Sequence, residues 1–343
     1  MENRWAGKRV LVTGVCGTVG RELLQQLAAA NPLDIVGIDN NESELFFLRE
    51  EYASQTNVHL YLGDVRDREY LISRARGIDV IIHTAAYKHV VLCEHSPWDA
   101  IQTNILGTQN VIEAGMSNEV ERVLFTSTDK AVNPTSVMGT SKLMGERLMT
   151  AANACRRGET PVFSSSRFGN VLGSRGSVIP LFARQIAAGG PLTLTDPGMT
   201  RFIMTLKQAV KLVMESVFMA QGGEVFVTKM PIVCIQDLAV VMIEELAPVH
   251  GFDPGQIEVK VTGARTGEKF YEELINEEEI RRVVELEDYF VVLPAFRSIY
   301  KKVTYPYPGI RSERIEQAYN SARGQPMDRE GLRRYLLDNQ LLD

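Results

Sequence analysis

A glycine-rich turn between an apolar strand and a helix constrains the fold of this chain more than any other single feature. Residues 8–13 form an apolar run that predicts a buried strand, and residues 21–30 have a helical pattern. Glycines allow a backbone to approach a pyrophosphate, and a helix N-terminus supplies N–H donors and partial positive charge. We therefore expect a dinucleotide at this turn, and a plain glycine turn is the alternative. The candidate contacts are Gly14, Gly17, Thr18, Val19 and Gly20.

Strand-like runs alternate with helical segments through the first half of the chain, which predicts an α/β fold with a doubly wound parallel sheet of the Rossmann type. We expect a nucleotide-binding domain over residues 1–170 and a smaller C-terminal α/β substrate-binding region over 171–300, with room for the two to interleave. The tail, 301–343, is charged and amphipathic, with expected helices at 313–322 and 329–341. The expected strands are 8–13, 34–38, 58–62, 79–83, 122–125 and 161–168, and the expected helices include 97–116, 143–154 and 178–188.

Asp39 ends the second expected strand, about 20 residues after the glycine turn, where a carboxylate binds the adenosine ribose and repels a 2′-phosphate. This position favours NAD over NADP, unless Asp39 is only a loop carboxylate beside a side chain that admits the phosphate. Asp64 and Val65 follow the third strand and are candidates for the adenine, although Asp64 at this spacing also fits a helix N-cap. Ala85 and Ala86 are small enough to allow close approach of the cofactor.

A carboxylate and an ammonium follow the fifth strand directly, in the segment Thr128-Asp129-Lys130. Residues just beyond the carboxyl end of a strand in an open α/β sheet face the ligand crevice. Asp129 and Lys130 are therefore a candidate acid–base pair, and a capped strand end is the alternative. Met138 and Lys142 are four residues apart, so they share one face of the helix that follows.

Three loops of the second half each carry one arginine, namely Arg175, Arg201 and Arg265. Guanidinium groups bind phosphate bidentately, so these loops predict a clamp for an anionic ligand, with solvated loop charge as the alternative. Two polar residues of the first half have open roles. His83 ends an apolar strand, which favours a hydrogen-bonded core histidine, and Asn104 lies inside an expected helix, with either a structural role or one near the nicotinamide.

Composition excludes several other functions. The formal net charge of −6 argues against general binding to nucleic acids or membrane surfaces. No signal-peptide pattern or membrane-spanning apolar run is present in the sequence. The four cysteines are scattered, which suggests neither a disulfide framework nor a metal site and fits a reducing cytoplasm.

Five segments of the sequence resemble one family in detail. Together with the glycine turn and Asp39, they are similar to extended short-chain dehydrogenases/reductases, and more narrowly to bacterial nucleotide-sugar 4,6-dehydratases of polysaccharide biosynthesis. The resemblance extends over residues 7–280 and implies NAD, a UDP-sugar substrate, usually UDP-N-acetylglucosamine, and a homo-oligomer. The segments are 85–90, 127–134, 167–178, 199–202 and 266–274.

The resemblance also implies a mechanism and the roles of individual residues. NAD⁺ takes the C4 hydride, Lys130 removes the C5 proton, Asp129 protonates the departing C6 hydroxyl, and the hydride returns to C6. Lys142 binds the nicotinamide ribose. Because a lysine base must be neutral, this mechanism requires a lowered pKa for Lys130. The implied substrate contacts are Lys88, Asn104, Asn170, Arg175, Arg201, Arg265 and Glu268.

Met138 departs from the pattern of most short-chain dehydrogenases, which have a tyrosine at this position as the base for the sugar hydroxyl. A subset of the dehydratases shares the methionine. The base for the C4 hydroxyl is therefore open between Asp129, Thr128 and a water relay. Two other functions compete: a nucleotide-sugar 4-epimerase or reductase on the same fold, and a non-catalytic NAD(H)-binding regulatory protein.

Overall fold

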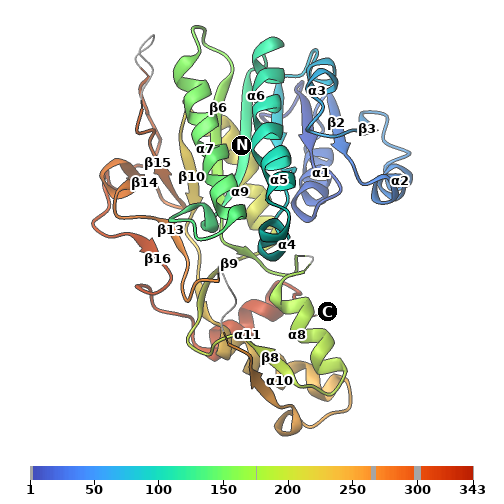
Figure 1. Cartoon of the computed structure of the whole chain (residues 1–343), viewed down its shortest axis with the longest axis vertical. Coiled ribbons are helices and arrows are strands. Elements are labelled where there is room, and N and C mark those ends of the chain that lie inside the picture. Colours follow the sequence, from blue (N-terminus) through green and yellow to red (C-terminus); the bar gives the residue numbers. More distant parts are fainter. Residues whose placement is uncertain (1–2, 175, 264–267, 297–302, 343) are drawn as a thin grey trace.

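A nine-stranded sheet forms the centre of the larger lobe of the computed structural model, which describes residues 3–174, 176–263, 268–296 and 303–342 (Figure 1). Neighbouring strands from β10 to β3 are parallel, whereas β14 and β15 are antiparallel additions at one edge. This topology confirms the predicted doubly wound sheet. In spatial order the strands are β14 (Val283–Glu285), β15 (Tyr289–Val292), β10 (Val225–Thr228), β6 (Val162–Phe168), β5 (Arg122–Thr128), β4 (Val80–His83), β1 (Arg9–Thr13), β2 (Asp34–Asp39) and β3 (Val58–Leu62).

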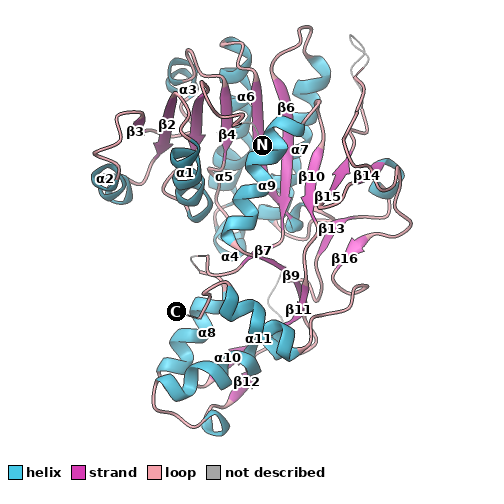
Figure 2. Ribbon diagram, turned by 180° about the vertical axis from the view of Figure 1, so that it is seen from behind, coloured by secondary structure: helices cyan, strands magenta, loops and turns pink. Residues whose placement is uncertain are grey.

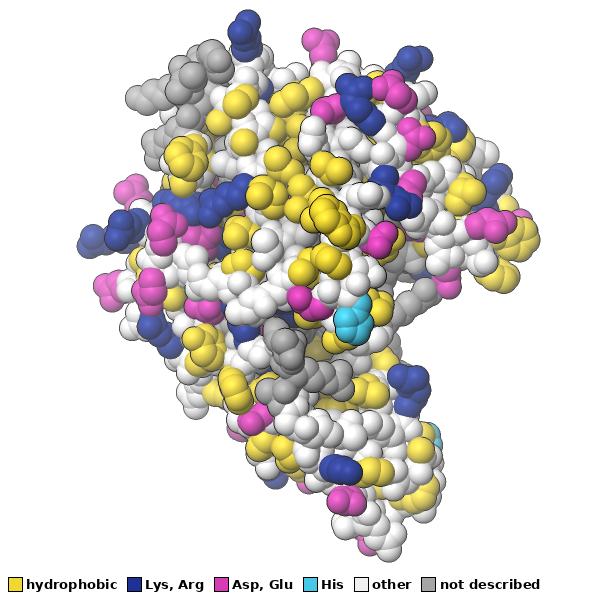
Figure 3. Space-filling view, in the orientation of Figure 1, with side chains coloured by type: hydrophobic (Ala, Val, Ile, Leu, Met, Phe, Trp, Pro, Cys, Tyr) yellow, Lys and Arg dark blue, Asp and Glu magenta, His cyan; other side chains and the backbone are white. Residues whose placement is uncertain are grey.

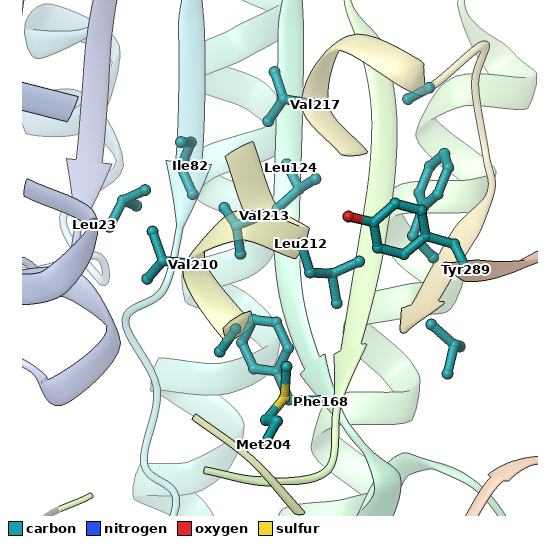
Figure 4. Packing of buried hydrophobic residues seen from close by; sticks show 14 of the residues in the cluster. Leu23, Ile82, Leu124, Phe168, Met204, Val210, Leu212, Val213, Val217 and Tyr289 are labelled. Carbon is teal, nitrogen blue, oxygen red and sulfur yellow. The ribbon is translucent and has the colours of Figure 1, made fainter. Parts of the chain in front are cut away.

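Helices cover both faces of this sheet (Figures 1 and 2). On one face α1 (Thr18–Ala30) packs beside α9 (Leu206–Met219), and on the other α6 (Gly107–Ser117) packs between α3 (Arg68–Arg74) and α7 (Val137–Cys155). Val210 and Val213 of α9 lie beside Ile82 and Leu124 of the sheet in one buried core (Figure 4). The other helical segments of this lobe are α2 (Glu42–Glu51), α4 (Val90–His95), α5 (Pro97–Ala100) and a π-helical turn (Ile101–Leu106).

A smaller lobe with its own apolar core lies below the carboxyl ends of the parallel strands (Figure 2). It contains α8 (Val178–Ala187), α10 (Ile235–Val249), α11 (Arg329–Asp338) and the paired strands β8 (Leu192–Leu194) and β12 (Val259–Val261). A three-stranded sheet connects the lobes: β7 (Asn170–Val171), β9 (Thr200–Met204) and β11 (Ile232–Cys234). Because β10, β14 and β15 also come from the second half of the chain, both halves contribute to the large sheet.

Two of the predicted helices differ from the structure for reasons that the contacts explain. Helix α7 begins at Val137 rather than at residue 143, because the Ser136 side chain caps it by accepting a hydrogen bond from the Gly139 N–H at 3.1 Å. The helix expected over 313–322 is wrong. Ser312, just before this segment, forms a bridge to Glu285, and the segment itself contains the short strand β16 (Tyr319–Asn320), which pairs with β13 (Glu273–Ile275). Tertiary strand pairing has overridden the local helical pattern.

Exposed apolar side chains gather over helices α4 to α7 on one face of the molecule (Figure 3). Trp98 is 76% exposed and Leu92 is 63% exposed, and both come from short helices that follow β4. Contiguous apolar surface of this kind is typical of protein contacts. The homo-oligomer expected from the sequence stays a prediction.

A buried arginine connects the large sheet to the C-terminal part of the chain through hydrogen bonds. Arg167 of β6 is 1% exposed. Its guanidinium donates two hydrogen bonds to Glu146 of α7, at 2.8 and 2.7 Å, and two to Glu279, at 2.8 and 2.7 Å. It also donates to the carbonyl oxygen of Leu274 in β13 at 2.8 Å. Five charge-assisted or carbonyl bonds therefore fix β13 relative to β6 and α7.

Replacing Arg167 by methionine should lower the free energy of unfolding by about 3–5 kcal/mol, because Glu146 and Glu279 would be left buried without their cation. Chemical denaturation followed by circular dichroism measures this loss. Arg311→Met is a matched control, since Arg311 is 56% exposed and pairs with a surface glutamate, Glu287; it should cost less than about 1 kcal/mol. Equal losses in the two variants would contradict the structural role given to Arg167.

Candidate active site

Two pockets lie along the carboxyl edge of the parallel strands. The first, of about 280 Å³, lies at the glycine turn, and the second, of about 530 Å³, lies beyond the ends of β5 and β6. The first is lined by residues that include Gly14, Gly17, Asp39, Asp64, Val65, Ala85 and Ala86. The second is lined by residues that include Asp129, Lys130, Asn170, Arg201, Glu268 and Glu272. Several residues predicted for the cofactor therefore line one cavity, and Asp129 and Lys130, predicted for the chemistry, line another.

The glycine turn is built by close backbone contacts that side chains would prevent. Gly14 has φ +74°, and a Cβ there would stand 2.6 Å from the Ala85 nitrogen. A Cβ on Gly20 would stand 2.1 Å from the Gly14 carbonyl oxygen. Gly17 is the N-cap of α1 and offers no side chain to cap it, and a helix N-terminus supplies N–H donors and partial positive charge to an anion. The turn therefore fits a dinucleotide pyrophosphate.

Asp39 lies at the end of β2 beside this turn. Its carboxylate accepts hydrogen bonds from the Cys16 N–H and the Asn41 N–H, each at 2.9 Å. These two bonds fix the carboxylate at the rim of the first pocket, where the sequence places the adenosine ribose.

Asp64 does not cap the next helix, which was the alternative interpretation of its position. The N-cap of α3 is Asp67, whose side chain accepts from the Tyr70 N–H. Asp64 instead pairs with Arg66 at 2.6 Å and accepts from Asn40 at 3.2 Å. The hydrogen bonds from Arg66 hold the pKa of Asp64 below its usual value, although partial burial opposes them. Asp64 and Val65 both line the first pocket, as the adenine assignment requires.

The segment Thr128-Asp129-Lys130 lies where β5 ends and a short 3-10 turn (Asp129–Ala131) begins. Asp129 is 2% exposed, and the Thr128 hydroxyl donates to its Oδ1 at 2.6 Å. The Lys130 Nζ donates to both carboxylate oxygens of Asp129, at 3.2 and 3.0 Å. The pair therefore lies in direct contact at the floor of the larger pocket.

Glu272 is a third ionisable member of this cluster that the sequence reading missed. Its Oε1 lies 3.4 Å from the Lys130 Nζ and 3.3 Å from the Arg201 Nε. Its side chain is 6% exposed, and it borders the same pocket. Glu272 is 142 residues from Lys130 in the chain, so no local pattern predicts the contact. The only signal was its place in the segment 266–274, which carries the family resemblance.

The electrostatics of the cluster correct the expected state of Lys130. Partial desolvation would lower the pKa of Lys130, but Asp129 and Glu272 raise it above its usual value, so the side chain is an ammonium. Burial would raise the pKa of Asp129, yet Lys130 and Thr128 hold it below its usual value. For Glu272, burial and the neighbouring Asp129 raise the pKa to about 7. The expectation of a lowered pKa for Lys130 is wrong for this arrangement, because two carboxylates face the ammonium.

Lys142 and Met138 lie on the first two turns of α7. The Lys142 Nζ donates to the Thr126 carbonyl oxygen at 2.9 Å and lies 4.5 Å from the centre of the Phe125 ring. Burial lowers the pKa of Lys142 to about 8, with Glu146 opposing the shift. Met138 is 3% exposed and packs in an apolar cluster with Cys93 and Ala100. This packing accounts for an apolar residue at position 138.

Of the three predicted arginines, Arg201 lies in the described part of the larger pocket, whereas Arg175 and Arg265 fall outside the described residues. Arg201 is 8% exposed, which contradicts a merely solvated loop charge. Its guanidinium donates to the carbonyl oxygens of Thr200 and Phe270 and lies 3.8 Å from Glu268. Asn170 of β7 borders the same cavity. Arg201, Glu268 and Asn170 are therefore brought together at one cavity, and the clamp for an anionic ligand stays a prediction.

Two other predicted substrate residues are placed elsewhere. Lys88 borders a small neighbouring cavity of about 270 Å³ rather than the larger pocket. Asn104 is 1% exposed in the π-helical turn, and its amide accepts from the Tyr87 N–H and donates to the Tyr87 carbonyl oxygen and the Ser141 hydroxyl. Of the two predicted roles for Asn104, the structural one therefore applies, because its hydrogen bonds connect the segment after β4 to α7.

His83 is a core histidine, as predicted. Its Nδ1 lies 2.7 Å from the Thr13 hydroxyl and its Nε2 lies 3.2 Å from the Thr108 hydroxyl. Burial, with a smaller effect from Lys142, lowers its pKa to about 3.

Within the described ranges, no helix combines the length and apolar character needed to cross a bilayer.

The sequence model of a family described as "Polysaccharide biosynthesis protein" matches residues 10–294. An "uncharacterized membrane protein" of Methanocaldococcus jannaschii is 47% identical to the chain, with 98% of this chain and 97% of the relative aligned. A crystal structure titled "Pen from Bacillus thuringiensis" is 38% identical, has a TM-score of 0.91, and aligns with 99% of this chain and 100% of its own.

Relatives with named activities differ in the reaction that their names give. A "UDP-N-acetylglucosamine 4,6-dehydratase (inverting)" of Campylobacter jejuni is 37% identical over 85% of this chain and 85% of its own length. A "UDP-glucose 4-epimerase" of Rickettsia akari is 36% identical over 96% of this chain and 95% of its own length. Both names describe reactions at a sugar linked to UDP.

A Gly20→Ala variant should lose at least about tenfold in dinucleotide affinity, because the new methyl group would collide with the backbone of the glycine turn. Fluorescence titration with the dinucleotide measures this change. Gly158→Ala is the control, since its Cβ would lie 3.7 Å from the nearest atom, the Thr160 carbonyl oxygen. Unchanged affinity in a folded Gly20→Ala protein would show that the dinucleotide binds elsewhere.

Proposed function

Because the chain belongs to the polysaccharide biosynthesis protein family, we propose that it is a nucleotide-sugar 4,6-dehydratase that uses NAD and acts on UDP-N-acetylglucosamine. The product is the corresponding UDP-2-acetamido-2,6-dideoxy-4-hexulose, and the net change is loss of one water. The observation that carries this proposal is the contact of Asp129 with Lys130, at 3.0 Å, on the floor of a pocket at the carboxyl end of β5.

When bound, NAD would supply hydride acceptance from C4 and hydride return to C6. Gly14, Gly17 and the N-terminus of α1 would hold its pyrophosphate, Asp39 its adenosine ribose, and Lys142 its nicotinamide ribose. Asp39 would also repel a 2′-phosphate, which supports NAD rather than NADP.

The acid–base pair would carry the elimination. Once C4 is a ketone, the C5 proton is acidic, and a neutral Lys130 would remove it while Asp129 gives a proton to the departing C6 hydroxyl. Each such proton transfer contributes roughly 10²–10⁴-fold to the rate. Lys130 then returns its proton to C5, and the proton released from the C4 hydroxyl replaces the one that leaves with water. The site ends with as many protons as it had at the start.

Transfer of one proton within this acid–base pair would convert the charge state of the free protein into the one that these roles require. Moving one proton from the Lys130 Nζ to the Asp129 carboxylate, across 3.0 Å, makes a neutral amine and a carboxylic acid in a single step. Filling the pocket with a sugar would remove water from both groups and favour their neutral forms. The raised pKa of Lys130 in the free protein is therefore compatible with the proposed base.

Two observations weigh against the competing functions. A 4-epimerase or reductase needs a base for the sugar hydroxyl but no acid–base pair for elimination, so the contact of Asp129 with Lys130 favours a dehydratase, and Met138, packed in an apolar cluster, cannot be that hydroxyl base. A regulatory NAD(H)-binding module has no use for a lysine and two carboxylates gathered below a pocket. Incubation with UDP-N-acetylglucosamine in D₂O, followed by NMR of the product, tests the proposal. It reports dehydration, deuterium at C5 and its configuration, whereas an epimerase would return a 6-hydroxy sugar.

Lys130→Ala and Asp129→Asn should each reduce turnover by at least about 10²-fold with the fold intact. The reason is that each removes one of the two proton transfers. Steady-state rates of 4-keto sugar formation, with circular dichroism as the test of folding, provide the measurement. Near wild-type dehydration by Lys130→Ala would remove lysine as the C5 base.

The Asp39→Ala variant should bind NAD more weakly and should discriminate less against NADP. The reason is that it lacks the carboxylate that accepts hydrogen bonds from the ribose hydroxyls and repels a 2′-phosphate. Titration with both dinucleotides measures the ratio of affinities. A wild-type preparation that releases mainly NADP(H) on denaturation would overturn this assignment of Asp39.

A further inference from the structure

A further cavity, of about 420 Å³, lies at the amino ends of β5 and β6, the edge of the large sheet opposite the two pockets of the candidate active site. Its lining includes two arginines: Arg122 is the first residue of β5, and Arg156 directly follows α7. Its volume is in the range of cavities that hold small molecules. The cofactor and the sugar substrate proposed above leave this cavity without a function.

Each of the two arginines contacts the protein through one terminal nitrogen. The Nη1 of Arg122 donates to the carbonyl oxygens of Val217 and Ala220, at the end of α9, at 3.0 and 2.9 Å. The Nη1 of Arg156 donates to two carbonyl oxygens just before β6. No described residue accepts a hydrogen bond from the Nε or the Nη2 of either arginine, and none of these nitrogens is enclosed in the interior. The Nε–Nη2 edge of a guanidinium can bind an anion through two parallel hydrogen bonds.

The acidic side chains near the cavity do not form ion pairs with these arginines. Glu121 lines the cavity, but it pairs with Lys8 at 2.7 Å. Glu159 also lines it, yet among the described residues no salt bridge joins it to either arginine. Burial lowers the pKa of both arginines, and the opposing effect of nearby carboxylates, the buried Glu224 among them, does not cancel it. The two cations are therefore partly desolvated without a counter-ion in contact, which an anionic ligand would supply.

We propose that this cavity binds the phosphate group of a small phosphorylated metabolite, with the Nε–Nη2 edges of Arg122 and Arg156 as its anion contacts. A phosphate monoester has three terminal oxygens, which can accept hydrogen bonds from both arginines. A carboxylate has only two oxygens, and one guanidinium edge is enough to satisfy them. The cavity also leaves room for the organic group that carries the phosphate.

The position of the cavity keeps this ligand apart from the proposed chemistry. Strand β5 begins at Arg122 and ends next to Asp129, and α7 carries Lys142 in its first half and ends next to Arg156. The cavity and the candidate active site thus lie at opposite ends of the same strand. A ligand can therefore occupy the cavity while the candidate active site is filled, and this inference does not depend on the proposed dehydratase function.

Isothermal titration calorimetry with inorganic phosphate tests the proposal. The full chain is loaded with NAD, and excess UDP is present to occupy the candidate active site. Arg122→Lys and Arg156→Lys keep the positive charge but lose the edge that binds at two points, so each should weaken phosphate binding at least about tenfold. Acetate should bind the wild-type protein at least about tenfold more weakly than phosphate does. A wild-type protein that binds no phosphate, or that binds acetate equally well, would overturn the proposal.

Arg311→Lys is the matched control, because Arg311 is 56% exposed and pairs with the surface residue Glu287. Its phosphate affinity should equal that of the wild-type protein. Wild-type affinity in folded Arg122→Lys and Arg156→Lys proteins would show that phosphate binds elsewhere, and would overturn the assignment of this cavity.

Chemical modification of the wild-type protein gives a readout that needs no variant. Phenylglyoxal reacts with accessible guanidinium groups, and peptide mass spectrometry locates the modified arginines. Phosphate should protect Arg122 and Arg156 from modification and leave the modification of Arg311 unchanged. Equal modification of Arg122 and Arg156 with and without phosphate would overturn the proposal even if the lysine variants fail to fold.

Discussion

The interaction on which the rest of this structure depends is the burial of the Arg167 guanidinium between two carboxylates. Glu146 belongs to α7, which also carries Lys142, and Glu279 follows β13, which carries Leu274 just beyond Glu272. A buried ion group adds little net stability compared with apolar packing, yet removing one partner is costly. Its effect here is geometric. It brings a strand from the last third of the chain against β6 and α7, and so completes the pocket below β5.

The two pockets are built by opposite means. The cofactor pocket depends on missing side chains, since Gly14 and Gly20 allow backbone atoms to approach where a Cβ would collide. The larger pocket depends on charged side chains that few residues could replace, with Arg201 fixed by Thr200, Phe270 and Glu272. This difference explains why the first pocket was predictable from a short local pattern. Its geometry is determined within one strand–turn–helix unit, whereas the second is assembled from segments far apart in sequence.

The limits of sequence reasoning follow the same division. The parallel sheet, the close backbone contacts of the glycine turn, the position of Asp39 beside it and the core role of His83 were predictable because strand and helix periodicity, turn chemistry and burial act locally. The predicted helix over 313–322 was wrong because pairing with β13 determines that segment. Glu272 was missed, and with it the ammonium state of Lys130, because a carboxylate 142 residues away in the chain sets that pKa. Electrostatics in a buried cluster is a property of the assembled fold.

The Asp129–Lys130 contact also suggests how Lys130 could serve as the proposed base. In the free protein the pair is ionised, and its ammonium is partly exposed to the pocket, so water contributes to holding the charges apart. A sugar that fills the pocket removes this water, and the desolvation penalty of an ion pair can then exceed its Coulombic attraction. The proton shift from Lys130 to Asp129 cancels both charges at once. Substrate binding would therefore create the base and the acid together, and an empty pocket would keep both unreactive.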